Sequence, residues 1–250
     1  MKEELKKKLL ASSKEYGDLY LPHISVDCVI FGFHNDCLKV LLVRLDGEKN
    51  WLLPGGFVEK GEDIFNAAHR ILMHRTGASN IFLTQFKTYG SIRRSEDFFS
   101  EMPDDLFHKK RFVTIGYYAL IDFTTLDPTI DTFSDACSWH NIEKFPKLGM
   151  DHQDIYKGAI MQLRRDLNYV PIGYNLLPEK FTMPQLQRLY EVILDKKLNR
   201  GNFYRRIMRY NILIKLNEKV TGFAHTSPNL YKFDKQQYQK ALENGFQDSW

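Results

Sequence analysis

The chain has too few cysteines for a covalent or metal-bound scaffold. Only three occur among 250 residues, Cys28, Cys37 and Cys137, and their spacing matches neither a disulfide framework nor a zinc site. With 15 glycines and 9 prolines, the chain is neither collagen-like nor of low complexity. Long apolar runs are missing, and the charged N-terminus lacks the apolar core of a signal peptide. The sequence therefore predicts a soluble, cytoplasmic protein that does not enter a membrane.

Charge is distributed unevenly along the chain. The formal net charge is +4 overall, but it is −2 over residues 1–150 and +6 over residues 151–250. Residues 196–232 contain nine lysines and arginines and one acid, Glu218. A basic segment joined to a nearly neutral body is typical of a protein that binds a polyanion. The alternative is a basic face that is merely solvated.

Apolar periodicity predicts a mixed α/β body. Strands are expected at 23–33, 38–45, 51–53, 81–91 and 112–123, and helices at 62–75 and 152–167. Residues 1–20 form a charged lead-in that is compatible with a helix. Residues 92–111 form a polar loop that is long enough to be functional or disordered.

A different pattern begins after residue 167. Residues 168–181 contain two prolines and are interpreted as an ordered linker. A capping box of Thr182 and Gln185 then opens a helix, and a polar turn leads to a second helix at 199–210. Two short strands, 212–216 and 230–233, follow. This order predicts a winged helix-turn-helix, so the domains are a lead-in (1–20), a body (21–167), a linker (168–181) and a winged helix domain (182–250).

Residues 56–77, GFVEKGEDIFNAAHRILMHRTG, carry a motif with fixed spacing. The segment resembles the Nudix box of the Nudix hydrolase superfamily, whose conserved positions are filled here by Gly56, Glu62, Arg70, Leu72 and Gly77. The resemblance implies a Nudix sandwich, a mixed sheet between helices, over about residues 23–167. It also implies that Glu62 and Arg70 form a structural pair between loop and helix.

The motif departs from the family at the positions that carry its chemistry. The three glutamates of the Nudix helix are replaced by Ile71, His74 and Arg75. Positions i, i+3 and i+4 share one helix face, and magnesium requires oxygen ligands that these side chains lack. We therefore expect no catalytic residue, no metal and no pyrophosphohydrolase activity. The alternative is a hydrolase acting on an ADP-ribose-like nucleotide, with metal ligands relocated to the long loop, from Asp97, Glu101, Asp104 or Asp105.

The second helix of the C-terminal domain has two contrasting faces. Phe203, Ile207 and Tyr210 form an apolar stripe, and the opposite face is basic. Arginine binds guanine and phosphate, and asparagine binds adenine, in the geometry that the major groove offers. The candidate DNA contacts are Arg200, Asn202, Arg205, Arg206 and Arg209 on the helix, and Lys215, Lys219, Thr221, His225, Ser227 and Lys232 on the wing. The alternative is a solvated helix face.

A degenerate Nudix body joined to a winged helix resembles the Nudix-related transcriptional regulators. The resemblance rests on the GYYALI segment (116–121), Trp139, Asp151-His152 and the PIGYNLLP segment (171–178). That family includes repressors of NAD metabolism that sense ADP-ribose-type ligands, and sugar-responsive regulators such as those for arabinose. The resemblance implies a homodimer that binds an inverted-repeat operator in double-stranded DNA, under the control of a small-molecule effector and without a cofactor.

Two classes of effector remain open at this point. ADP-ribose needs cations for its phosphates, which Arg44, Lys60, Arg75, Arg93 and Arg94 offer. A neutral pentose needs hydroxyl-binding groups and a stacking ring. The combined candidate set is Asp27, Arg44, Phe57, Tyr89, Arg93, Trp139, Asp151 and His152. Since the PIGYNLLP segment is most similar to the sugar-responsive members, a pentose such as arabinose is favoured by analogy over a sugar-nucleotide.

Overall fold

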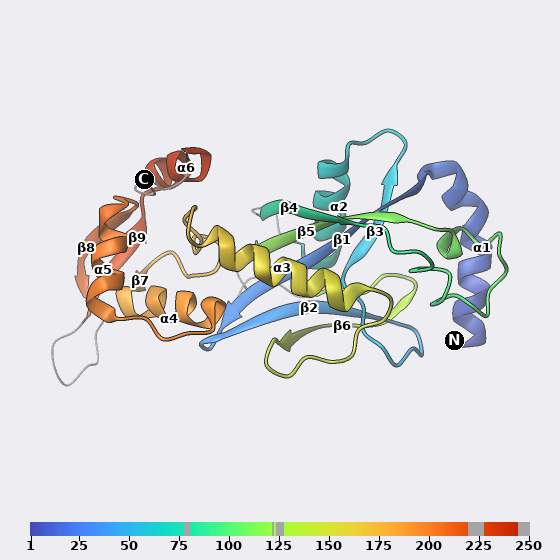
Figure 1. Cartoon of the computed structure of the whole chain (residues 1–250), viewed down its shortest axis with the longest axis horizontal. Coiled ribbons are helices and arrows are strands. Elements are labelled where there is room, and N and C mark those ends of the chain that lie inside the picture. Colours follow the sequence, from blue (N-terminus) through green and yellow to red (C-terminus); the bar gives the residue numbers. More distant parts are fainter. Residues whose placement is uncertain (78–80, 122, 124–127, 220–227, 245–250) are drawn as a thin grey trace. The chain divides into compact units, whose positions relative to one another are not determined.

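The chain divides into two units according to its internal contacts. A computed structural model describes residues 1–77, 81–121, 123, 128–219 and 228–244 (Figure 1). The first unit comprises residues 1–32 and 39–159, and the second comprises residues 33–38 and 160–250. In the described part of the chain, no helix is long and apolar enough to cross a membrane.

The first unit is built on a six-stranded mixed sheet. Its strand order is β4–β5–β1–β2–β6, and β3 pairs with β1. Strands β1 and β5 run parallel, whereas β1 with β3, β2 with β6 and β4 with β5 are antiparallel. The strands are β1 (Tyr20–His34), β2 (Cys37–Leu45), β3 (Gly55–Glu59), β4 (Phe82–Tyr89), β5 (Val113–Ile121) and β6 (Ser134–Asn141).

A helix covers each face of this sheet. Successive side chains of a strand point to opposite faces, so Cys28 and Ile30 pack against α2 (Ile64–Thr76) in the main core. Phe31 points the other way, and its ring lies 6.4 Å from that of Tyr156 on α3 (His152–Asp166). The middle of β1 is therefore buried on both sides. This arrangement confirms the α/β Nudix sandwich that the motif implied.

Several expected elements form with shifted ends, and one does not form. Residues 51–53 make only isolated bridges, Val43 with Leu52 and Trp51 with Leu148, because Pro54 interrupts the extended run. Strands β3 and β6 were not expected. The first begins with two glycines, and the second, SDACSWHN, lacks an apolar alternation. A turn at Asn35-Asp36 joins β1 to β2, and both residues have positive φ, as in a tight hairpin turn.

The lead-in and the long polar loop pack together. Residues 3–19 form α1 (Glu3–Leu19), and residues 107–109 form a short 3-10 helix, η1 (Phe107–Lys109), which lies beside α1 (Figure 1). Leu5 and Leu9 of the helix share a second apolar cluster with Phe99, Met102 and Leu106 of the loop. The loop is thus an ordered wall of the first unit, held by side chains whose irregular spacing gave no periodic signal.

The second unit confirms the winged helix-turn-helix. Its helices are α4 (Met183–Leu194), α5 (Arg200–Arg209) and α6 (Lys235–Asn244). Its sheet has the order β7–β9–β8, formed by Phe181–Thr182, Asn229–Phe233 and Leu213–Lys219. The predicted capping box opens α4: the Thr182 amide donates to Gln185 Oε1 at 2.7 Å, and the Gln185 amide donates to Thr182 Oγ1 at 3.4 Å.

The segment interpreted as a linker contributes to the core of this unit. Ile172 and Leu176 are buried, and the Tyr238 hydroxyl donates to the carbonyl oxygen of Pro171 at 2.8 Å. Tyr238 lies on α6, a helix that was not expected from the sequence. Residues 168–181 are therefore packed rather than extended.

Candidate functional site

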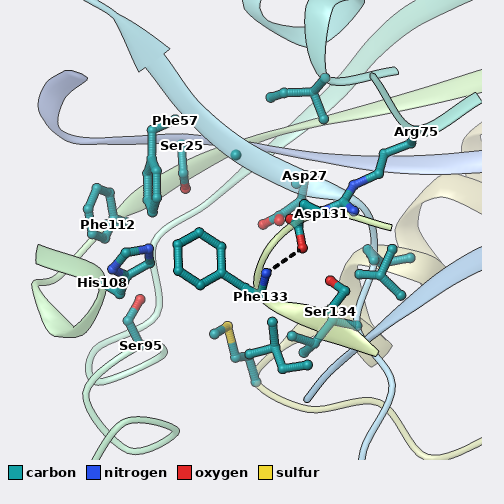
Figure 2. A pocket seen from close by; sticks show the side chains of 18 of the residues that line it. Ser25, Asp27, Phe57, Arg75, Ser95, His108, Phe112, Asp131, Phe133 and Ser134 are labelled. Atoms are coloured by element: carbon teal, nitrogen blue, oxygen red, sulfur yellow. Dashed lines mark hydrogen bonds and ion pairs between the residues drawn. The ribbon is translucent and has the colours of Figure 1, made fainter. Parts of the chain in front are cut away.

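A cavity of about 560 Å³ lies in the first unit, within the range that holds small-molecule ligands. Residues of α1, β1, β3, α2 and the two segments preceding β5 and β6 line it. One wall is aromatic, and Figure 2 shows Phe57, Phe112 and Phe133 grouped there with His108. The rings of Phe57 and Phe112 lie 4.9 Å apart at 41°. Such a wall offers stacking surface to a flat ligand group.

The floor of the cavity carries a buried charge cluster. Arg94 Nη2 donates to Asp27 Oδ2 at 2.9 Å, and Arg94 Nε donates to the carboxylate of Asp151 at 2.9 and 3.0 Å. The Leu53 amide donates to Nδ1 of His152 at 2.8 Å, so in the neutral ring the proton is on Nε2. That nitrogen lies 3.7 Å from Asp27 Oδ1. The fold thus brings together Asp27, Asp151 and His152, three of the predicted ligand contacts.

A glycine makes room for this floor. Gly55 of β3 pairs with Asp27 of β1, and a Cβ at position 55 would lie 2.4 Å from Asp27 Oδ1. No side chain fits at that distance, so β3 can approach the carboxylate only with glycine there. The Pro54-Gly55-Gly56 run at the start of the Nudix box therefore shapes the site, because its middle glycine leaves space for Asp27.

Burial and pairing fix the protonation of the cluster. Burial alone would raise the pKa of Asp27, but the groups around it, including the cation of Arg94, outweigh burial and hold that pKa below its ordinary value. Burial lowers the pKa of His152 and keeps the ring neutral. Two carboxylates, one guanidinium and a neutral imidazole give the cluster a formal net charge of −1. It therefore suits hydroxyl donors and repels phosphates.

The predicted pair of Glu62 and Arg70 is present. Arg70 Nε donates to Glu62 Oε2 at 3.1 Å, and Arg70 Nη2 donates to the Phe57 carbonyl oxygen at 2.9 Å. The Glu59 amide donates to Glu62 Oε1 at 2.9 Å. These bonds join the loop to α2 and confirm the structural role that the resemblance implied.

The side chains on the Nudix face of α2 do not supply the oxygen ligands that the magnesium ion of Nudix enzymes needs. Ile71 is buried and apolar, His74 is exposed, and Arg75 forms an ion pair with Asp131. Among the described residues, no group of three or more His, Cys, Asp or Glu side chains is placed to hold a metal. A hard cation therefore has no set of oxygen ligands on this helix face.

The acids of the long loop do not replace the missing ligands. Asp97 pairs with Arg93, Glu101 with Lys6, and Asp104 with Lys109, at 2.7, 3.2 and 2.7 Å. None of these carboxylates, nor that of the exposed Asp105, belongs to the described lining of the cavity. These acids of the loop therefore do not lie together beside α2 as a set of metal ligands.

Five of the predicted ligand contacts, Asp151 among them, lie outside the described cavity lining. Arg44 Nε donates to Asp135 Oδ1 at 2.8 Å, and Arg93 pairs with Asp97 on the surface. The Tyr89 hydroxyl donates to the Asp154 carbonyl oxygen at 3.4 Å, and Trp139 pairs with Leu41 in the sheet. Lys60, also considered for a phosphate, donates to the last carbonyl groups of α1 instead. Sequence reasoning missed the lining residues Tyr16, Tyr20, His108, Phe112 and Phe133.

Unsatisfied polar atoms concentrate in this cavity. Within the described residues, seven buried side-chain polar atoms lack a hydrogen-bond partner. Four of them belong to residues that line the cavity: Ser25 Oγ, Arg75 Nη1, His108 Nδ1 and Ser134 Oγ. Buried polar atoms are nearly always paired, so this concentration marks the cavity as a site for a polar ligand.

The burial of His108 predicts that the stability of the folded protein decreases in acid. Burial among aromatic rings lowers its pKa to about 4, so the folded protein holds it neutral while the unfolded chain protonates near pH 6.5. Since the unfolded state binds the proton more readily, stability falls as the pH drops from about 6.5 to 4, by up to ~3 kcal/mol. The His108→Phe variant should lose less stability over this range in urea titrations. An equal loss in both proteins would contradict the assignment.

The basic face of α5 is exposed as predicted. Phe203 and Ile207 are buried, whereas the predicted DNA contacts of this helix are exposed: Arg200, Asn202, Arg205, Arg206 and Arg209. Asn199 caps the helix by accepting from the Asn202 amide at 3.0 Å. Arg205 Nη2 donates to Asn202 Oδ1 at 2.6 Å, and Arg206 Nε donates to the Tyr210 hydroxyl at 2.7 Å. These bonds orient the arginines along one surface.

The predicted wing is only partly described. Lys215 is exposed on β8, Lys232 lies on β9, and Lys219 pairs with Asn229 at the end of the hairpin. Thr221, His225 and Ser227 lie outside the described residues. The hairpin itself therefore agrees with a wing, while the contacts at its tip stay predictions.

Fold and sites together define a Nudix domain followed by a winged helix domain. The NUDIX domain family matches residues 21–158, and the NrtR DNA-binding winged helix domain family matches residues 173–233. The chain belongs to the NrtR-type, Nudix-related transcriptional repressors. It is 30% identical over 230 residues to the ADPR responsive transcriptional repressor NtrR of Acinetobacter baylyi, covering 89% of this chain and 86% of that protein.

Two solved structures agree with this assignment. The crystal structure of Shewanella oneidensis NrtR is 27% identical, covers 90% of this chain and 98% of its own, and has a TM-score of 0.72. The structure of the same protein with a 27mer DNA covers 90% and 97%, also with a TM-score of 0.72. The family and the fold expected from the sequence are thereby confirmed.

Proposed function

We propose that this protein is a transcriptional repressor whose Nudix unit binds ADP-ribose and whose winged helix unit binds operator DNA. The observation that carries the proposal is the division of the cavity into an aromatic wall and a separate acidic floor. A base can stack on the wall around Phe57, and ribose hydroxyls can donate to the Asp27 carboxylate of the floor. The ADP-ribose responsive relative of Acinetobacter baylyi supports this choice of effector.

A pentose such as arabinose is the second candidate. The acidic floor, with Asp27 and the neutral His152, suits the hydroxyl groups of a free sugar equally well. The aromatic wall extends over Tyr16, Phe57 and Phe112, and a single sugar ring bound at the floor would leave this wall uncovered. The cavity therefore favours a ligand that has both a flat base and a ribose.

The basic face of α5 is the proposed contact with DNA. Its arginines and Asn202 are exposed, whereas Phe203 and Ile207 are buried, as in a recognition helix that meets the major groove. The relative whose structure holds a 27mer DNA supports this role. We infer that the protein acts as a homodimer on an inverted repeat, because two-fold protein symmetry is mirrored in the operator.

The same proposal makes the Nudix unit a sensor rather than an enzyme. Hydrolysis of a diphosphate in this fold needs a metal to neutralise the phosphates and to activate water. The helix face that should hold the metal carries Ile71, His74 and Arg75 instead. The cavity can thus bind its ligand, but it lacks the metal-binding side chains that hydrolysis in this fold requires.

Calorimetry with ADP-ribose and L-arabinose tests the choice of effector. We expect ADP-ribose to bind and to raise the melting temperature by mass action, and arabinose to do neither. Phe57→Leu should weaken binding roughly tenfold, as expected for a lost base-stacking contact. Phe82→Leu is the matched control, because Phe82 is also half-buried but lies outside the described lining. Binding of arabinose alone would contradict the proposal.

A further inference from the structure

Arg75 is a buried cation with unused hydrogen-bonding capacity. Its side chain is 10% exposed and forms an ion pair with Asp131 through Nη2. Its other terminal nitrogen, Nη1, is buried and has no hydrogen-bond partner among the described residues. Figure 2 shows Arg75 and Asp131 facing each other at the cavity. The resemblance to the Nudix box places this arginine where the family has a metal-binding glutamate.

The other arginines that line the cavity each bind two acidic side chains. Arg70 is bonded to Glu62 and to the Phe57 carbonyl oxygen, and Arg94 is shared by Asp27 and Asp151. Their charges are cancelled inside the protein. Arg75 differs, because one nitrogen is unpaired and its single acidic partner is more exposed than the arginine itself.

Asp131 has the properties of a replaceable counter-ion. Its side chain is 40% exposed, and its carboxylate also accepts the Phe133 amide at 3.0 Å. The preceding backbone is anchored to α2, since the Thr129 amide donates to the Arg75 carbonyl oxygen at 3.0 Å. Turning the carboxylate away breaks its bonds to Arg75 and to the Phe133 amide, while the bond between the Thr129 amide and the Arg75 carbonyl oxygen still holds the segment on α2. A buried guanidinium needs an anion beside it, and phosphate oxygens bind arginine in the same forked geometry as a carboxylate.

We propose that Arg75 takes the place of the absent metal ion and binds the diphosphate of the effector directly, displacing Asp131. This inference rests on the proposed function, since it assumes an effector with a diphosphate. The Ser134 hydroxyl, unpaired and lining the same cavity, is placed to donate to a phosphate oxygen as well. The floor at Asp27 repels phosphates, so the diphosphate belongs at the Arg75 end and a ribose at the floor.

Effector binding should then be independent of magnesium. Substitution of Arg75 and substitution of Asp131 should change the affinity in opposite directions. In calorimetry, the affinity for ADP-ribose should agree within about twofold between EDTA and magnesium buffers. Arg75→Gln should weaken binding about 10- to 100-fold, since it removes a charged hydrogen-bond donor. Asp131→Asn should tighten binding about three- to tenfold, because the competing anion is lost. The matched controls are Arg93→Gln and Asp97→Asn, an exposed arginine–aspartate pair outside the described cavity lining, and they should change binding less than twofold.

Comparing a ligand that has a diphosphate with one that has none distinguishes phosphate binding by Arg75 from a folding defect. The ratio of the affinities for ADP and for adenosine should fall in Arg75→Gln and rise in Asp131→Asn, which a damaged fold cannot produce in both directions. Tighter binding in magnesium by tenfold or more, or weaker binding in Asp131→Asn, would overturn the inference. Binding of ADP-ribose that is unchanged in both variants would overturn the inference and leave the proposed function intact. Failure of the wild-type protein to bind ADP-ribose in either buffer would overturn the proposed function itself.

Discussion

Replacing Arg205 and Arg206 together with alanine should lower the affinity for operator DNA by roughly 100-fold or more. Each arginine that contacts a base contributes about 1–3 kcal/mol, and each phosphate contact also weakens with salt. Both side chains are exposed, whereas Phe203 and Ile207 of the same helix are buried. Their loss should therefore change the free energy of unfolding by less than about 0.5 kcal/mol.

Titrations of operator and scrambled DNA at several salt concentrations give the measurement. A lost guanine contact relaxes selectivity at one base pair, whereas a lost phosphate contact weakens both DNAs alike and reduces the salt slope by about one unit. Arg93→Ala with Arg111→Ala is a control of equal charge, because both arginines are exposed in the first unit. Unchanged affinity in the Arg205 and Arg206 variant would mean that the basic face of α5 is only solvated.

The purified protein should leave ADP-ribose intact in the presence of magnesium or manganese. Typical enzymes turn over about 10 times per second, and a helix face of Ile71, His74 and Arg75 offers no carboxylate to hold the metal that this chemistry uses. Product formation followed by chromatography over hours is the measurement. Turnover of about 1 per second or faster would contradict the sensor assignment.

A control identifies the source of any activity. Glu59 is a carboxylate that lines the cavity, 3.3 Å from Arg70 Nε. Turnover that disappears in Glu59→Gln belongs to this chain and refutes the account. Turnover that is equal in Glu59→Gln and in the wild-type protein belongs to a contaminating hydrolase only if a further purification step removes it, and turnover that the step leaves in place refutes the account as well.

Features encoded by local spacing were predictable from the sequence. Apolar periodicity predicted α2 to within two residues at each end, and the Nudix box predicted the pair of Glu62 and Arg70, because each depends on residues close in the chain. The capping box at Thr182 marked the start of α4 for the same reason. The two faces of α5 followed from the helical period alone.

Features that depend on distant contacts were not predictable in the same way. The long loop looked polar, yet three of its apolar side chains pack against Leu5 and Leu9 of α1, more than 80 residues away in sequence. The aromatic wall draws on α1, β3 and the segments before β5 and β6, which no local pattern connects. Asp27 and Asp151 were proposed separately, but Arg94, which joins them, was assigned to phosphate binding.

The response of DNA binding to the effector is the most direct test of the account. Duplexes selected by the protein from a random pool should contain an inverted repeat, and their affinity should be measured with and without saturating ADP-ribose. Coupling of about 1–3 kcal/mol between the two sites predicts a 5- to 150-fold change in affinity with ADP-ribose, and none with arabinose. Unchanged affinity at an ADP-ribose concentration that calorimetry shows to be saturating would contradict the account.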